Sequence, residues 1–404
     1  MNNKKKYLSI IISFNALDRF LYNQDYLIKK LSKNFDKIFI INSENLKFFS
    51  KKKDYKISTE VKKFPNNFIL FDPKDSKDLS KFLEDKTILV INYFGRQFPE
   101  LKIHLLLKKY KIQQLLITNY GHVTTSQITQ FKHFFKLLSY YSNNIFAKKF
   151  TNLLSILGII SKIEIQFLSA KVIMESFQND FFKRLFYKYK FTFAKEYILV
   201  NSKTYDILID SKIPLGEDYI VHIDASLNYY HETELRGKLD KETIRNHYYY
   251  LEKILKRLSQ EFNKEVLVCI HPAYDTEEHQ NYFKDFKVLK FKTRENIYKS
   301  FLVTTFDSTA IVDAILLKKK IIGFISDVMS KNEIEHTKSF ADRGGYLKLN
   351  TQKDYLFDKE KILFQMNKNL SNYDKYILNH HCFEPNNLGI DKIIRIIKER
   401  FFNV

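Results

Sequence analysis

The sequence of 404 residues has no tryptophan, two cysteines, nine glycines and six prolines. Two cysteines, Cys269 and Cys382, cannot build a disulfide scaffold, so the sequence predicts a protein of a reducing compartment. The glycines form neither a G-x-G-x-x-G nor a G-x-x-x-x-G-K-[ST] pattern, which excludes the common dinucleotide and P-loop fingerprints. No D-x-D pair is present, so the usual acidic clamp for a metal-bound nucleotide is missing as well.

Long hydrophobic runs are also missing. The apolar run that starts at Tyr7 ends at Phe14, and Asp18 and Arg19 follow where a signal peptide would carry small residues. The longest strongly apolar stretch elsewhere, Leu153–Ile160, is far shorter than the ~20 residues of a membrane-spanning helix. We therefore expect a cytoplasmic protein.

The remaining composition is that of a globular chain, with 45% hydrophobic and 28% charged residues. A chain of this length accommodates two domains. Short apolar runs alternate with helical patterns, which is typical of βαβ units around a buried parallel sheet. In the first part, strands are predicted at Tyr7–Ser13, Lys37–Asn42, Phe68–Phe71, Thr87–Phe94 and Gln114–Gly121, with helices at Phe20–Phe35 and Pro99–Lys111.

The same alternation returns in the second half. Strands are predicted there at Glu196–Asn201, Asp218–Asp224, Val266–Ile270, Lys287–Phe291, Phe301–Phe306 and Lys320–Ile325, with helices at Lys241–Phe262, Thr309–Leu317 and Ile390–Phe402. The pattern predicts an α/β protein with two Rossmann-like domains facing a central cleft. We assign residues 1–130 to an N-terminal acceptor domain and residues 196–404 to a C-terminal nucleotide-donor domain.

The charge of the chain is strongly basic: 67 Lys and Arg side chains stand against 46 Asp and Glu, a formal net charge of +21. Residues 131–195 alone carry eleven Lys and Arg against Glu164, Glu175 and Asp180. One hypothesis is a helical, membrane-facing region on an anionic inner-membrane surface, near a lipid-linked acceptor. The alternative is a pair of inter-domain core helices with solvated lysines. The overall charge also fits the Lys-rich composition of an AT-rich genome.

Three groups of polar residues follow predicted strands of the second half, where ligands of open α/β sheets bind. His271 and Pro272 follow the strand Val266–Ile270, and an imidazole there can act on a phosphate. Asp307, Ser308 and Thr309 follow the strand Phe301–Phe306, before a helix. Their hydroxyls and the helical N–H groups suit an anion, although a simple N-cap has the same pattern.

The third group is Asp224 with His231 and Glu232, after the strand Asp218–Asp224. A carboxylate at a strand end can serve as a general base for an acceptor hydroxyl, and it can equally cap a turn. Asn119 and His122, after the strand Gln114–Gly121, are candidates for the acceptor site. Arg343 and Tyr346 are candidates for covering the nucleotide.

The order of these groups resembles that in GT-B glycosyltransferases of bacterial surface polysaccharides, over about Asp218–Ser326. More narrowly, the chain resembles the bacterial sialyltransferase and polysialyltransferase-like group, with its HP and S-S/T motifs. His271–Pro272 matches the first motif, and Ser308–Thr309 matches the second. The D/E-D/E-G base motif of that group has no match here, because Tyr219 follows Glu217 and Asp218. We therefore assign the base to Asp224.

The resemblance implies that His271 neutralises the donor phosphate and that Ser308 and Thr309 help to hold it. It implies no metal and no cofactor, with a nucleotide sugar as a substrate. The function we expect is an inverting glycosyltransferase of capsule or lipooligosaccharide assembly, with a CMP-activated acidic sugar such as sialic acid or Kdo favoured. A CDP-polyol phosphotransferase of teichoic-acid type is an alternative. A non-enzymatic binder of nucleic acid or membrane is a further one, although no nucleic-acid module signature is present.

Overall fold

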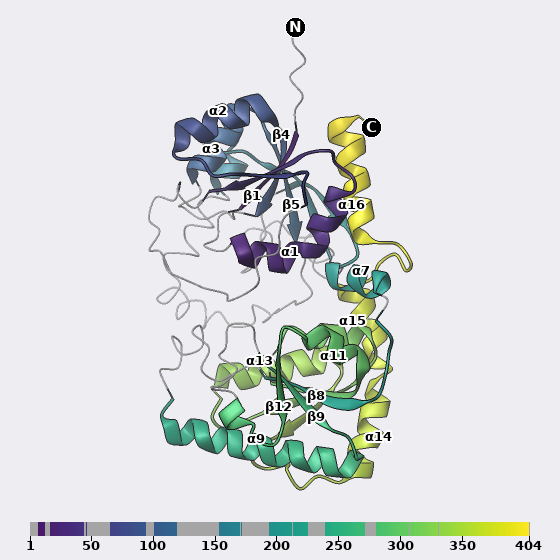
Figure 1. The fold of residues 1–404 in the computed structure, drawn as a ribbon. Coiled ribbons are helices and arrows are strands. Elements are labelled where there is room, and N and C mark those ends of the chain that lie inside the picture. Colours follow the sequence, from purple (N-terminus) through teal and green to yellow (C-terminus); the bar gives the residue numbers. More distant parts are fainter. Residues whose placement is uncertain are drawn as a thin grey trace. The chain divides into compact units, whose positions relative to one another are not determined.

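The computed structural model describes residues 7–12, 17–43, 46, 65–93, 101–118, 153–169, 171, 194–211, 213–224, 239–270, 280–306, 308–329 and 331–403. The chain divides into two compact units (Figure 1). Unit 1 comprises Met1–Tyr120, Gln127–Ile207 and Cys382–Val404, and unit 2 comprises Gly121–Ser126 and Leu208–His381. Each unit is built around its own parallel sheet.

The sheet of unit 1 has the order β3-β2-β1-β4-β5-β6-β7 in the described residues, and all neighbouring strands are parallel. The strands are β1 (Tyr7–Ile12), β2 (Ile38–Asn42), β3 (Phe68–Phe71), β4 (Thr87–Tyr93), β5 (Gln113–Thr118), β6 (Ile163–Leu168) and β7 (Ala194–Leu199). Most of them are apolar on both faces, as expected for strands covered by helices on both sides. This confirms the predicted βαβ pattern.

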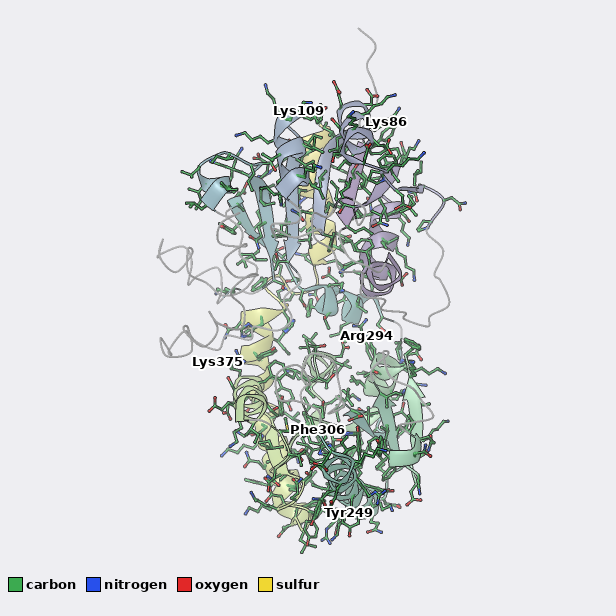
Figure 2. The ribbon with its side chains drawn as sticks, turned by 90° about the vertical axis from the view of Figure 1, so that its left-hand side faces the viewer. Lys86, Lys109, Tyr249, Arg294, Phe306 and Lys375 are labelled. Carbon is green, nitrogen blue, oxygen red and sulfur yellow. The ribbon has the colours of Figure 1, made fainter. Side chains whose placement is uncertain are left out.

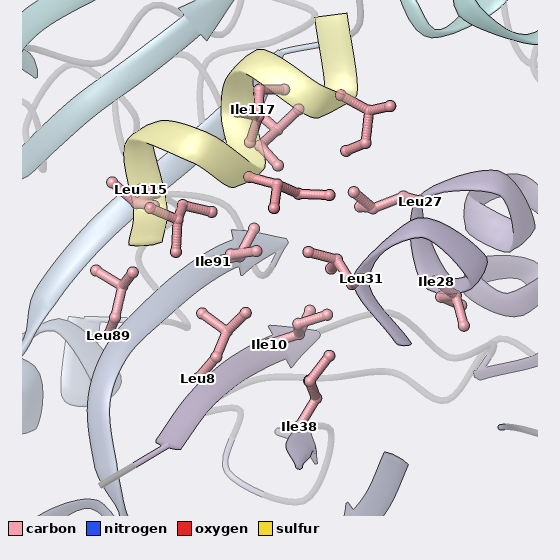
Figure 3. Close-up of a cluster of buried hydrophobic side chains, with 14 of the residues drawn as sticks. Leu8, Ile10, Leu27, Ile28, Leu31, Ile38, Leu89, Ile91, Leu115 and Ile117 are labelled. Atoms are coloured by element: carbon pink, nitrogen blue, oxygen red, sulfur yellow. The ribbon is translucent and has the colours of Figure 1, made fainter. Parts of the chain in front are cut away.

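Helices cover both faces of this sheet. On one face, α1 (Leu17–Ser32) and α16 (Gly389–Ile397) form a core with Leu8 and Ile10 of β1 and with alternate residues of its neighbours (Figure 3). On the other face, α2 (Ser76–Lys86) and α3 (Leu101–Lys109) pack against residues such as Ile11. Successive side chains of β1 point to opposite faces of the sheet, so they pack into two separate cores.

The C-terminal segment belongs to unit 1, far in sequence from the rest of it. Asp206, in α7 (Lys203–Asp210), is buried and accepts hydrogen bonds from the backbone N–H groups of Gly389 (2.7 Å) and Ile390 (2.8 Å) at the start of α16. A Cβ on Gly389 would lie 2.3 Å from the carbonyl oxygen of Asn201, so only glycine fits there. A π-helical turn, η3 (Lys398–Phe402), ends the segment.

The sheet of unit 2 has the order β10-β9-β8-β11-β12-β13, again with parallel neighbours. Its strands are β8 (Tyr219–Asp224), β9 (Val266–Ile270), β10 (Lys287–Lys290), β11 (Ser300–Thr305), β12 (Lys320–Ile325) and β13 (Leu347–Asn350). Its helices are α9 (Lys241–Phe262), α11 (Thr293–Lys299), α12 (Ile311–Leu316), α13 (Lys331–Gly344), α14 (Lys359–Asn369) and α15 (Asn372–His380). One face of the sheet shares a core with α9 and α14.

The domain boundaries differ from the predicted ones in three respects. The predicted boundary after Lys195 falls inside β7, which pairs with β6 in the sheet of unit 1. The region 131–195, predicted to be helical, contains strand β6 instead. Most side chains of β6 (Ile163–Leu168) are buried in unit 1. The terminal helix, predicted as part of the donor domain, contributes to the core of unit 1. Long-range pairing decides all three, and local periodicity does not reveal it.

Candidate functional site

The strand order of unit 2 creates a topological switch point between β8 and β11. Chain connections lead from β8 to β9 and β10 on one side, and β11 leads to β12 and β13 on the other. Ligands of open α/β sheets bind outside the carboxyl ends of the strands at such a point. Asp224 ends β8, and Ser308 and Thr309 come shortly after the end of β11. The two strands are register partners up to Ile223 and Thr305. Two of the three predicted groups therefore flank the switch point.

The remaining group, His271 and Pro272, lies outside the described residues, as do Asp307, His231 and Glu232. The position of its strand is nevertheless clear, because β9 pairs with β8 and Ile270 is the register partner of Asp224. His271 follows Ile270 directly in the sequence. Asn119 and His122 also lie outside the described residues, after β5 of unit 1. Their roles stay predictions.

Ser308 and Thr309 do not cap the following helix in the way that the sequence suggested. Helix α12 begins at Ile311, and its N-cap position is Ala310, which receives no side-chain hydrogen bond. Ser308 Oγ accepts a bond from the backbone N–H of Ala310 (3.3 Å), so its side chain closes a local turn. Phe306, beside this turn, is buried, whereas Thr309 is exposed (Figure 2 labels Phe306). The Thr309 side chain is thus accessible to a ligand.

Asp224 is almost fully buried, with 2% of its surface exposed. The hydroxyl of Tyr248, from α9, donates to Asp224 Oδ2 at 3.4 Å, and His222 Nε2 lies 4.0 Å from Asp224 Oδ1. A general base must come within hydrogen-bond distance of the acceptor hydroxyl. In the described geometry, the burial of Asp224 favours a fixed, internally bonded carboxylate. Its role as the base stays a prediction.

A buried polar layer surrounds Asp224, and the sequence reasoning missed most of it. His222 Nδ1 lies 3.0 Å from Thr304 Oγ1, and His247 Nδ1 lies 2.9 Å from Ser326 Oγ. Gln352 Nε2 donates to the same Ser326 hydroxyl at 2.9 Å. The one available signal was the alternation His222-x-Asp224 within an apolar strand, because alternate residues share a face.

The rings around His222 make its environment apolar. Those of Phe283, Phe306 and Phe324 have centroids 6.1, 5.9 and 5.9 Å from the imidazole. Burial, with a smaller effect of His247, lowers the pKa of His222 to about 3. The imidazole is therefore neutral near pH 7.

Two further observations bear on ligands. Tyr346, a candidate for covering a nucleotide, is buried, and its ring occupies the space next to Gly323 and Gly344. That prediction is wrong, because the side chain is part of the core of unit 2. Within the described ranges, no group of three or more His, Cys, Asp or Glu side chains is arranged to hold a metal ion.

Neither the comparison with protein families nor the comparison with curated sequences yields a match. Solved structures, however, resemble the whole chain. The wall teichoic acid polymerase TagF has a TM-score of 0.51 and 12% sequence identity over 99% of this chain and 90% of its own. The calicheamicin glycosyltransferase CalG4 has a TM-score of 0.51 and 10% identity over 99% of both chains.

A putative UDP-N-acetylglucosamine 2-epimerase from Listeria monocytogenes gives a similar result. Its TM-score is 0.50, with 12% identity over 99% of this chain and 98% of its own. Likeness at such low identity concerns the fold, and it agrees with the two parallel α/β units described above. The chain has a GT-B-like α/β fold, as the sequence predicted.

Proposed function

We propose that this protein is a glycosyltransferase that uses a nucleotide-activated sugar, with a CMP-activated acidic sugar as the favoured donor. The observation that carries the proposal is the switch point of unit 2, where Asp224 ends β8 and the Ser308–Thr309 pair follows the neighbouring strand β11. The similar structures support it, since one is named a glycosyltransferase and another an epimerase of a UDP-sugar. The likeness of the HP and S-S/T motifs to those of sialyltransferases points to CMP.

In the proposed reaction, an acceptor hydroxyl attacks the anomeric carbon from the side opposite the nucleotide. The bond from that carbon to the phosphate oxygen breaks, and the nucleotide leaves with the electron pair. His271 neutralises the departing phosphate, while the hydroxyls of Ser308 and Thr309 hold it, so no metal is needed. Asp224 is the predicted acceptor of the proton. The acceptor is a surface glycan or its lipid-linked precursor.

A thermal-shift panel of CMP, CDP, UDP, GDP and ADP, with and without magnesium, tests this proposal. We expect CMP to raise the unfolding temperature without magnesium, because a nucleotide that binds only the folded state stabilises it. Ser308→Ala and Thr309→Ala should each weaken CMP binding about tenfold, the equivalent of one lost hydrogen bond to a charged group. Ser371→Ala, which removes an exposed hydroxyl at α15, should leave CMP binding unchanged.

Other results would contradict the proposal in distinct ways. A shift with UDP or GDP but not with CMP would overturn the choice of donor while keeping nucleotide binding. A shift with none of the five nucleotides would overturn the assignment as a nucleotide-dependent transferase.

A CDP-polyol phosphotransferase is the second candidate, favoured by the likeness to TagF, which is named a wall teichoic acid polymerase and has been soaked with CDPG. The two candidates differ in the fate of phosphorus. Transfer from a CDP-polyol releases CMP and leaves one phosphate on the product, whereas transfer from a CMP-sugar leaves none. Product analysis for phosphorus after turnover separates them.

We also propose that the protein contacts an anionic membrane surface through the region 131–195. Leu153, Leu157 and Ile159 in this region are exposed, and Lys162 lies next to them in the sequence. Among the described helices, none is both long and apolar enough to cross a bilayer. Apolar side chains flanked by basic ones are typical of proteins that lie on anionic lipid.

Leu157→Glu should weaken binding to vesicles of phosphatidylglycerol and phosphatidylcholine about tenfold, since a buried leucine contributes ~1.5–3 kcal/mol. Co-sedimentation with the vesicles measures this. Leu356→Glu, at an equally exposed leucine of unit 2, is the matched control and should have little effect. Equal losses in both variants, or no binding by the unchanged protein, would contradict the membrane proposal.

A further inference from the structure

The face of the second sheet that lies under α9 changes from apolar to polar toward its carboxyl edge. Along β8, side chains on this face run from Ile220 through His222 to Asp224. In helix α9, the buried His247 and Tyr248 follow Ile244 in the first two turns, and the buried residues from Leu251 onward are aliphatic. A buried polar layer costs stability unless its groups bond to one another. Its location at the switch point suggests a role in the chemistry there.

His222 is the central residue of this layer. It is fully buried, it is neutral near pH 7, and its Nδ1 is bonded to the hydroxyl of Thr304 at 3.0 Å. Its other nitrogen, Nε2, has no hydrogen-bond partner in the described part of the chain and lies 4.0 Å from Asp224 Oδ1. A movement of about 1 Å would bring this pair to a normal hydrogen-bond distance.

The tautomer of His222 follows from these neighbours. A neutral imidazole carries one N–H. If the proton were on Nδ1, the lone pair of Nε2 would face the lone pairs of Asp224 Oδ1, which is unfavourable. If it is on Nε2, the N–H dipole points at Asp224 and the Thr304 hydroxyl donates to Nδ1. The second arrangement gives Nδ1 a donor and points the Nε2–H at a carboxylate oxygen 4.0 Å away, so electrostatics favours the Nε2–H tautomer even without a hydrogen bond at Nε2.

Tyr248 completes the arrangement from a different element. Its hydroxyl donates to Asp224 Oδ2, the oxygen that His222 does not face. The preceding residue, His247, is bonded to Ser326 just after the end of β12, which connects this turn of α9 to the sheet. Asp224 thus accepts a hydrogen bond from α9 on one oxygen, while Nε2 of His222, on its own strand, faces the other oxygen at 4.0 Å.

We propose that His222 is a positioning residue, whose Nε2–H orients the Asp224 carboxylate at the switch point. The consequence for turnover rests on the proposed function, in which Asp224 acts on the acceptor. The orientation itself does not, since it depends only on groups within unit 2. The two can therefore be tested separately.

The first experiment needs no substrate. Long-range ¹H–¹⁵N NMR of the ¹⁵N-histidine-labelled protein reports which ring nitrogen carries the proton, and His222→Gln identifies the signal. We expect the Nε2–H tautomer, with a shift of the Nε2 resonance in Asp224→Asn and a smaller one in Tyr248→Phe. An Nδ1–H tautomer, or a resonance unaffected by Asp224→Asn, would overturn the proposal even if the protein is a transferase.

The second experiment uses the transferase reaction. His222→Phe places an apolar ring among three phenylalanines, so the fold is retained, and we expect kcat to fall about tenfold with KM for the donor unchanged. His222→Gln supplies an N–H near the same place and should recover part of the lost kcat. A purely structural residue would give a different result: kcat would fall in both variants together with thermal stability, and glutamine would restore neither. That result would overturn the proposal. If the unchanged protein transfers nothing, the proposed function fails, while the NMR result still decides the positioning.

Discussion

Replacing Asp206 with alanine should lower the free energy of unfolding by about 3–5 kcal/mol. The buried Asp206 carboxylate accepts the N–H groups of both Gly389 and Ile390, with one bond to each oxygen. Each hydrogen bond to a charged group contributes ~1.5–3 kcal/mol, and alanine leaves both N–H groups buried and unpaired. The carboxylate also lies at the positive end of α16, which adds to the loss. Urea unfolding at neutral pH measures the change.

Two further variants make the Asp206 result interpretable. Asp206→Asn keeps one acceptor oxygen, so it should retain part of the lost stability. Asp240→Ala removes the cap of α9, where the exposed carboxylate accepts from Thr243 N at 2.8 Å, and should cost clearly less than Asp206→Ala. If Asp206→Ala costs no more than Asp240→Ala, the buried carboxylate does not hold the C-terminal segment in unit 1.

Most strands were predictable from the sequence because buried parallel strands leave a strong local signal, although β6 and β13 were missed. Continuous apolar runs such as those of β1 and β9 are too short for helices and stand between amphipathic segments. The placement of α16 was not predictable in this way. Its isoleucines recur at intervals of three and four residues, which predicts a helix, but its position in unit 1 depends on Asp206 and Asn201, more than 180 residues earlier in the chain. Local patterns carry no information about such pairings.

The sequence predicted the location of the candidate site but not the buried side chains that surround Asp224. Polar residues after strand ends indicated the carboxyl edge, since parallel strands bring these ends together. Tyr248 and Thr304 could not be identified as site residues from the sequence, because the pattern around each predicts an ordinary core residue of its own helix or strand. Only the pairing of β8 with β11 and the packing of α9 bring them to His222 and Asp224. The cap predicted at Ser308 failed because a turn precedes the helix.

Acidification from pH 6.5 to about pH 4.5 should remove about 5 kcal/mol of stability, through two buried histidines of unit 2. Burial lowers the pKa of His222 to about 3, and burial with the nearby Arg343 charge lowers the pKa of His380 to about 4, from an ordinary value of 6.5. Between these values the unfolded chain binds a proton that the folded protein does not. Stability is therefore complete above pH 6.5 and falls as the pH decreases, by ~1.4 kcal/mol per pH unit for each histidine.

The slope of stability against pH, rather than its level, is the quantity that tests the two histidines. Carboxylates with lowered pKa values, such as Asp240 and Asp327, lose their contribution only below about pH 4, so they leave this window undisturbed. Urea unfolding at several pH values should show the slope halved in His222→Phe and again reduced when His380→Phe is added, even if each variant is less stable at pH 7. An unchanged slope in His222→Phe would mean that His222 is already protonated in the folded protein. In that state Nδ1 could no longer accept a hydrogen bond from the Thr304 hydroxyl, and the charged ring would form an ion pair with Asp224. The slope of stability between pH 6.5 and pH 4.5 therefore also tests whether His222 is neutral, which the proposed orientation of Asp224 requires.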